Sequence, residues 1–154
     1  MKNHYLKMLD YELWANHRII QMLLSVNQEQ IPERVVEIFS HILAAQRIWY
    51  SRITDQVCPV KVWEKVPINE WESRLNENIA LLKDLVNQFS EQDYNRIISY
   101  SNSFGLAYKN PIGEIFNHFP MHSAYHRGQI VILIRKELDK VPLLDYIQFA
   151  REML

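Results

Sequence analysis

The sequence predicts an all-α protein built as an antiparallel four-helix bundle, with a short C-terminal helix and a short hairpin before the last long helix. Only three glycines occur in 154 residues, which leaves few places for the positive φ angles that tight hairpin turns need. Apolar residues instead recur at alternating steps of three and four over long stretches, which is the spacing of one helix face. Four amphipathic helices bury those faces most simply around one common core.

The first predicted helix spans about residues 3–26, and its apolar stripe contains one polar residue, Asn16. The second spans about 32–54, because proline suits the first turn of a helix and Pro32 precedes a further apolar stripe. Residues 55–68 contain two prolines together with apolar residues, and we expect a connecting loop that lies over the core.

The third predicted helix spans about 69–90 and begins at Asn69, a residue type that caps helices. The stretch 95–109 is rich in strand-tolerant residues and predicts the short hairpin. The fourth helix spans about 111–137, after a cap at Asn110, and we expect Pro120 inside it to bend its axis. The tail from Pro142 predicts a short docking helix.

Length and composition indicate a single domain over residues 1–154 and exclude several classes of function. Seventeen basic and eighteen acidic residues give a net charge of -1, which disfavours nucleic acid as a partner. No apolar run approaches the roughly 20 residues that a membrane span needs. The single cysteine, Cys58, and the absence of a signal-like start lead us to expect a cytoplasmic protein.

Three of the six histidines follow one another at steps of four residues in the fourth predicted helix: His118, His122 and His126. Imidazoles four residues apart share a helix face and can converge on one divalent ion. His41 lies beside the apolar stripe of the second predicted helix and is the candidate third ligand. Three histidines without a fourth side chain leave a position open for water or substrate, as in catalytic zinc sites.

A simpler interpretation stays open at this point, because an inward histidine is often a core residue that bonds to a backbone carbonyl. On that interpretation the histidines are packed or form a pH-sensitive cluster. His118 precedes Pro120, and the expected bend would turn it away from the pair, so we expect His118 to support the ligands and not to belong to them.

The segment His122-Ser-Ala-Tyr-His126-Arg127-Gly128-Gln129 resembles the His-x-x-x-His-Arg-Gly-Gln signature of the DinB/YfiT-like metalloprotein family, which is distinct from the polymerase called DinB. Tyr11-Glu-Leu-Trp14-Ala15-Asn16 is similar to the Trp-Ala-Asn segment of that family's first helix. Ser40-His41-Ile-Leu-Ala is similar to its second-helix ligand motif. These segments occur in the family's order and span nearly the whole chain.

The resemblance implies a four-helix bundle that binds zinc, nickel or a similar divalent ion through His41, His122 and His126. It also implies that a homodimer is common. Members of the wider family include S-transferases and isomerases that use low-molecular-weight thiols, and others are called metal-dependent hydrolases. The resemblance therefore leaves the substrate open and assigns no catalytic residue.

Four polar or small residues near these motifs predict local contacts. Arg127 is expected to pair with an acid of the first helix or, less simply, to anchor a substrate anion. Gly128 would allow the close approach of another backbone, and Gln129 could orient a ligand histidine. Asn16 interrupts an apolar stripe, so we expect it to link two helices by hydrogen bonds.

Three functional hypotheses follow. The first is a metal-dependent enzyme, either a small-molecule hydrolase or a thiol transferase, in which the ion activates a water or a thiol. No Glu lies between the paired histidines, which disfavours peptidase chemistry of the His-Glu-x-x-His type. The second is a non-catalytic metal-binding or stress-response bundle, and the third is a dimeric interaction protein with packed histidines.

Overall fold

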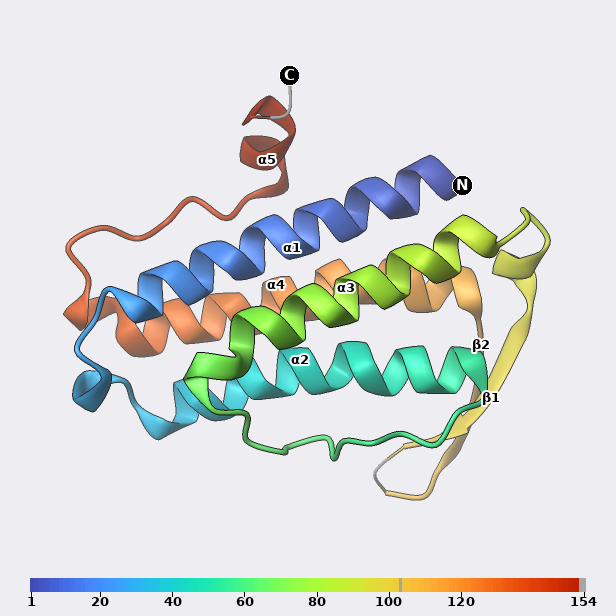
Figure 1. Cartoon of the computed structure of the whole chain (residues 1–154), viewed down its shortest axis with the longest axis horizontal. Coiled ribbons are helices and arrows are strands. Elements are labelled where there is room, and N and C mark those ends of the chain that lie inside the picture. The colour runs from blue at the N-terminus through green and yellow to red at the C-terminus, as the bar shows by residue number, and fades with distance from the viewer. Residues whose placement is uncertain (103, 153–154) are drawn as a thin grey trace.

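The computed structural model describes residues 1–102 and 104–152, and four long helices dominate it, as predicted (Figure 1). A fifth, short helix follows them, and a two-stranded antiparallel hairpin precedes the last long helix. The elements are α1 (Lys2–Leu24), α2 (Glu33–Thr54), α3 (Trp71–Gln88), β1 (Ile97–Ser101), β2 (Ala107–Pro111), α4 (Ile112–Ile134) and α5 (Tyr146–Glu152). Single 3-10 turns lie at Gln28–Gln30, Ile68–Glu70, Asp93–Asn95 and Arg135–Glu137.

Helices α1 and α2 lie diagonally across the bundle, and each packs against both α3 and α4. Figure 1 shows α3 in front of the pair and α4 behind it. The apolar faces of all four helices meet in one core, whose fully buried members include Leu9, Phe39, Trp71 and Phe116. The helical periodicity of the sequence therefore correctly predicted which face of each long helix packs into the core.

The expected antiparallel arrangement holds for only some neighbouring helices. Helices α1 and α4 run in one direction, while α2 and α3 run together in the other (Figure 1). The reason is the connection over residues 55–67, which returns along the length of the bundle before α3 starts. Helix α2 has 22 residues and is about 33 Å long, and thirteen extended residues reach up to about 43 Å, so this loop can span the bundle.

Several helix boundaries differ from prediction by one or two residues. Pro32 lies just before α2 and not in its first turn, and Asn69 lies in a 3-10 turn, so α3 begins at Trp71 without a side-chain cap. Asn110 does not cap α4, because its Oδ1 accepts a hydrogen bond from the Tyr100 hydroxyl at 2.8 Å. Helix α4 is continuous through Pro120.

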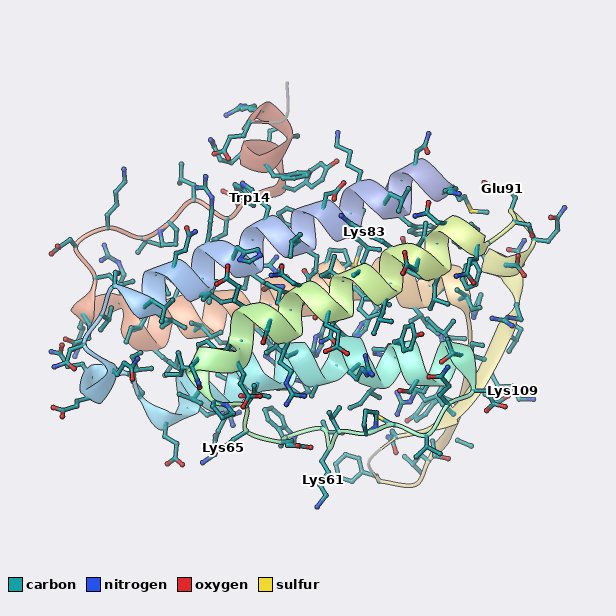
Figure 2. All side chains as sticks on the ribbon, in the orientation of Figure 1. Trp14, Lys61, Lys65, Lys83, Glu91 and Lys109 are labelled. Carbon is teal, nitrogen blue, oxygen red and sulfur yellow. The ribbon has the colours of Figure 1, made fainter. Side chains whose placement is uncertain are left out.

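The tail docks through α5 on the outer side of α1, as predicted. Phe149 of α5 is buried against Tyr11 and Trp14 of α1. Trp14, labelled in Figure 2, lies between the two helices, and its Nε1 donates to Glu152 Oε2 at 2.9 Å. Among the described residues, no helix combines the length and apolar character that crossing a membrane requires.

Trp71 fixes the end of the 55–67 loop to the core. Its ring is fully buried with its centroid 4.5 Å from that of Phe39, and its Nε1 donates to Val66 O at 3.0 Å. The backbone N–H of Val66 in turn donates to Ser40 Oγ at 3.0 Å. The loop is thus joined to the core at Val66, which bonds both to Trp71 and to Ser40, the residue before His41.

We predict that Trp71→Phe lowers the free energy of unfolding by about 1–3 kcal/mol, because it removes buried volume and one donor to Val66 O. Urea denaturation would measure this change. Trp63→Phe is the control, since Trp63 is 52% exposed and its loss should cost less than about 0.5 kcal/mol. Equal costs for the two variants would contradict this role for Trp71.

Candidate metal centre

The structure brings together the three histidines that the sequence singled out. His41 comes from α2, and His122 and His126 come from successive turns of α4, which packs against α2. One ring nitrogen from each histidine lies within 4.8 Å of the other two. His41 Nε2 and His122 Nε2 lie 3.1 Å apart. Three histidines are therefore positioned to bind a metal ion.

Two of the rings are held by hydrogen bonds through their other nitrogen. His41 Nδ1 lies 2.9 Å from the carbonyl oxygen of Val62, and His126 Nδ1 lies 2.8 Å from Gln129 Oε1. A carbonyl oxygen only accepts, so each Nδ1 donates and each Nε2 carries the lone pair. Such bonds commonly orient metal-binding histidines, and Gln129 takes the orienting role predicted for it.

The chemistry of this donor set fits a divalent cation. With its Nδ1 protonated, neutral His41 presents a lone pair to His122 Nε2 across 3.1 Å. Two facing lone pairs repel, so either a proton or a cation must lie between the two nitrogens. Nitrogens bound to one tetrahedral zinc ion lie roughly 3.4 Å apart, which is close to the observed separation.

Burial favours the neutral form of His41 and His122. It lowers the pKa of His122 from an ordinary value of 6.5 to about 3, helped by the neighbouring His126, His118 and His41. Burial also lowers the pKa of His41, and the bond to Val62 only partly offsets this effect. Neutral imidazole is the form that binds metal, so the site is competent near neutral pH.

The 55–67 loop covers one side of the cluster. The Trp63 ring stacks on the His41 ring with a centroid distance of 4.1 Å and an interplanar angle of 17°. The Arg34 guanidinium lies 5.1 Å from the centroid of the same Trp63 ring. This loop therefore supplies both the Val62 carbonyl and an aromatic cover for His41.

His118 lies next to the cluster and outside it, as expected. Its ring centroid is 4.9 Å from that of His122 and 5.8 Å from that of Trp49. The three-histidine group does not include it. Burial lowers the pKa of His118 as well, so it too is neutral near pH 7.

A buried polar network lies directly behind the histidines. Arg127, 1% exposed, donates through Nη1 to Glu12 Oε2 and to Asn16 Oδ1, both at 3.1 Å, and through Nη2 to the Tyr11 hydroxyl at 3.2 Å. The Ser123 hydroxyl donates to Glu12 Oε1. Arg127 is therefore the predicted ion-pair partner of a first-helix acid, and its guanidinium is not free to anchor a substrate anion.

The network continues into the other two helices. Gln46 of α2 donates to Glu12 Oε1 at 3.0 Å, and its own Oε1 accepts from Asn78 Nδ2 of α3 at 3.4 Å. Asn16 links α1 to α4, as predicted, although its Nδ2 has no partner among the residues described. The prediction for Gly128 is wrong, because a Cβ there would meet nothing within 4 Å.

Sequence reasoning missed Glu12, Gln46 and Ser123. Glu12 lies three residues after Leu9 and four before Asn16, which is the spacing of the buried stripe, so its position on the helical wheel was the available signal. The same signal was available for Gln46, which lies four residues after Ile42, and for Ser123, which lies four residues after Phe119. The Val62 carbonyl is a backbone group, so the type of residue at that position does not predict the hydrogen bond.

Comparisons with known proteins show what the chain is similar to. The model described as the DinB family matches residues 1–153. The protein named DinB from Bacillus subtilis (strain 168) is 20% identical over 152 residues, which cover 88% of this chain and 87% of that protein. No solved structure matches the chain.

The buried ion pair yields a stability prediction. Glu12→Gln leaves the Arg127 charge buried without a counter-charge, so we expect it to lower the free energy of unfolding by about 3–5 kcal/mol. The double variant Glu12→Gln/Arg127→Met should cost less than the sum of the two single changes. Glu70→Gln, in the exposed pair with Arg74, is the control and should cost less than about 1 kcal/mol. Additive costs in urea denaturation would contradict this coupling.

The low pKa of His122 predicts an acid-sensitive fold in the metal-free protein. Its folded pKa of about 3 lies below its ordinary value of 6.5, so the unfolded chain binds a proton between these values and the folded chain does not. His122 therefore costs no stability above pH 6.5, and the free energy of unfolding falls as the pH drops from 6.5 toward 3.

Urea denaturation of chelator-treated protein at a series of pH values measures this dependence. We expect His122→Gln, which does not titrate, to give a shallower decline than the wild type, while the exposed His4→Gln variant follows the wild type. Identical slopes for all three proteins would show that His122 is not protected from protonation.

Proposed function

This chain belongs to the DinB family, and from that premise we propose that it binds a divalent metal ion through His41, His122 and His126 and acts as a metal-dependent enzyme on a small molecule. The observation that carries the proposal is the 3.1 Å separation of His41 Nε2 and His122 Nε2. Because the Val62 carbonyl already occupies His41 Nδ1, the lone pair of His41 points at its neighbour.

Imidazole ligands suit zinc, nickel, copper and iron, and we propose zinc or nickel because the family resemblance implies these two. A three-histidine site leaves at least one coordination position open, and an ion there would lower the pKa of a bound water or thiol toward neutrality. Hydrolysis and thiol transfer are the two reactions that such a site supports. In hydrolysis the ion activates a water, and in thiol transfer it activates a thiol. A substrate screen shows which of the two reactions the protein carries out.

The chain's own residues prepare the site for this role. Val62 and Gln129 hold two of the rings in one tautomer, and burial favours the neutral form of His41 and His122. Trp63 covers the His41 ring and limits water on that side. The Ser123 hydroxyl is bonded to Glu12, so it is not offered as a nucleophile. These features favour a reaction in which the nucleophile comes from outside the chain.

Metal content tests the proposal directly. We expect elemental mass spectrometry to find close to one divalent ion per chain in tag-free protein purified without added metal. His122→Ala/His126→Ala should lose it, because a single remaining imidazole binds divalent ions weakly. His4→Ala controls for the loss of an exposed histidine. Wild-type protein that binds no divalent ion on titration with better than micromolar affinity would overturn the proposal.

Activity is a separate measurement on the same proteins. Metal-loaded wild type would be screened with small esters, amides and thiol acceptors, with His126→Ala as the inactive reference. Turnover that depends on His126 supports the enzyme, and its substrate type assigns hydrolysis or thiol transfer. Stoichiometric metal without turnover in either panel would instead favour a non-catalytic metal-binding bundle.

A further inference from the structure

A cavity of about 430 Å³ opens between α2, the hairpin and the first half of α4. We call it the hairpin pocket and define it by the side chains that carry its chemistry, which are Trp49, Tyr100, Asn110, Glu114, His118 and Met121. Its volume falls within the roughly 300–1,000 Å³ that small-molecule sites occupy. The metal ligands themselves do not line it, so the pocket is a separate feature of the surface.

The hairpin pocket borders the three-histidine cluster. His118 lines the pocket, and its ring centroid is only 4.9 Å from that of the proposed ligand His122. A molecule in the pocket is therefore separated from the cluster by a single imidazole ring. A molecule held here by α2 and the hairpin would therefore lie beside the three-histidine cluster.

The charge of the pocket selects for cations. Glu114 is its one charged lining residue, and within the described chain its carboxylate forms no ion pair. The Arg52 guanidinium lies 4.6 Å from the Trp49 ring centroid and 4.5 Å from that of Tyr100, but it is not part of the lining and it donates to Ser101 O at 2.9 Å. At Glu114 itself an anion would therefore meet a carboxylate without an ion-pair partner among the described residues, while an ammonium group would gain such a partner.

The walls of the pocket are apolar and aromatic. The rings of Trp49 and Tyr100 meet edge to face with centroids 4.8 Å apart, and Ile115 and Met121 complete the surface. Aromatic walls bury the apolar part of a ligand. The Asn110 carboxamide accepts from the Tyr100 hydroxyl, which leaves its N–H donors for the ligand.

We propose that the hairpin pocket binds a small primary amine with an aromatic or branched apolar body, its ammonium group at Glu114, and that it is the substrate pocket of the metal centre. The second part rests on the proposed function, whereas the binding of an amine does not. The proposal narrows the substrate class to amines and disfavours carboxylates of the same shape.

Three probes of matched shape test the charge selection: phenethylamine, 2-phenylethanol and phenylacetate. Binding to chelator-treated full-length protein at pH 7 is followed by NMR, including the side-chain amides of Asn110 and Asn117, which line the pocket. We expect the amine to bind at least fivefold more tightly than the carboxylate and to shift those amides. Equal affinities, or shifts confined to other residues, would overturn the proposal.

A charge variant tests Glu114 itself. Glu114→Gln should remove the preference for the amine and leave the affinity for 2-phenylethanol within twofold, because Glu114 is exposed and the fold does not need its charge. Asp84→Asn, which removes an exposed carboxylate from α3, is the matched control and should keep the preference. A Glu114→Gln protein that still prefers the amine would exclude Glu114 as the recognition group.

Experiments on metal-loaded protein distinguish amine binding in the pocket from its role as the substrate pocket of the metal centre. In cobalt-loaded protein, the phenethylamine resonances should broaden relative to the zinc-loaded sample, because a ligand beside His118 lies close to the ion. Amine selectivity without that broadening in metal-loaded protein would overturn the role as substrate pocket. Amine selectivity in a protein that binds no metal would support the amine site and overturn the proposed metal enzyme.

Discussion

The buried charge of Arg127 is the constraint around which the bundle is arranged. A guanidinium stays charged inside a protein, so a position that is 1% exposed demands a counter-charge and hydrogen-bond acceptors on every side. Glu12, Asn16 and Tyr11 of α1 supply them. These contacts fix how α1 and α4 lie against each other, and α2 joins them through Gln46.

This constraint also sets the rotation of α4 about its own axis. Ser123 follows His122 in the sequence, and Arg127 follows His126, so the network and the histidines occupy adjacent strips of one helix. Successive residues on a helix point about 100° apart. When hydrogen bonds lock Ser123 and Arg127 toward α1, the two histidines are turned toward His41 of α2. The buried hydrogen bonds of Ser123 and Arg127 thus help to hold the two histidines in position for the cluster.

Helical spacing made much of this predictable, including the long helices, the histidines at steps of four and the inward position of His41. The parallel direction of α2 and α3 was not, because it depends on the path of the 55–67 loop, and local periodicity contains no information on loop paths. The Val62 carbonyl was missed for a related reason, since backbone acceptors have no residue signature. Glu12 was hidden among charged residues that usually lie at the surface.

Glu12 and Arg127 are separated by 115 positions in the chain, and His41 and His122 by 81. Contacts between such distant residues form only after long segments have been ordered. A polypeptide emerges from the ribosome with its N-terminal part first, so α1, α2 and α3 are complete long before their partners on α4 exist. The acid that ends fully buried therefore stays in water for most of synthesis. The histidine cluster can form only once α4, the last long helix, has packed against α2. The metal site is therefore completed in one of the final steps of folding.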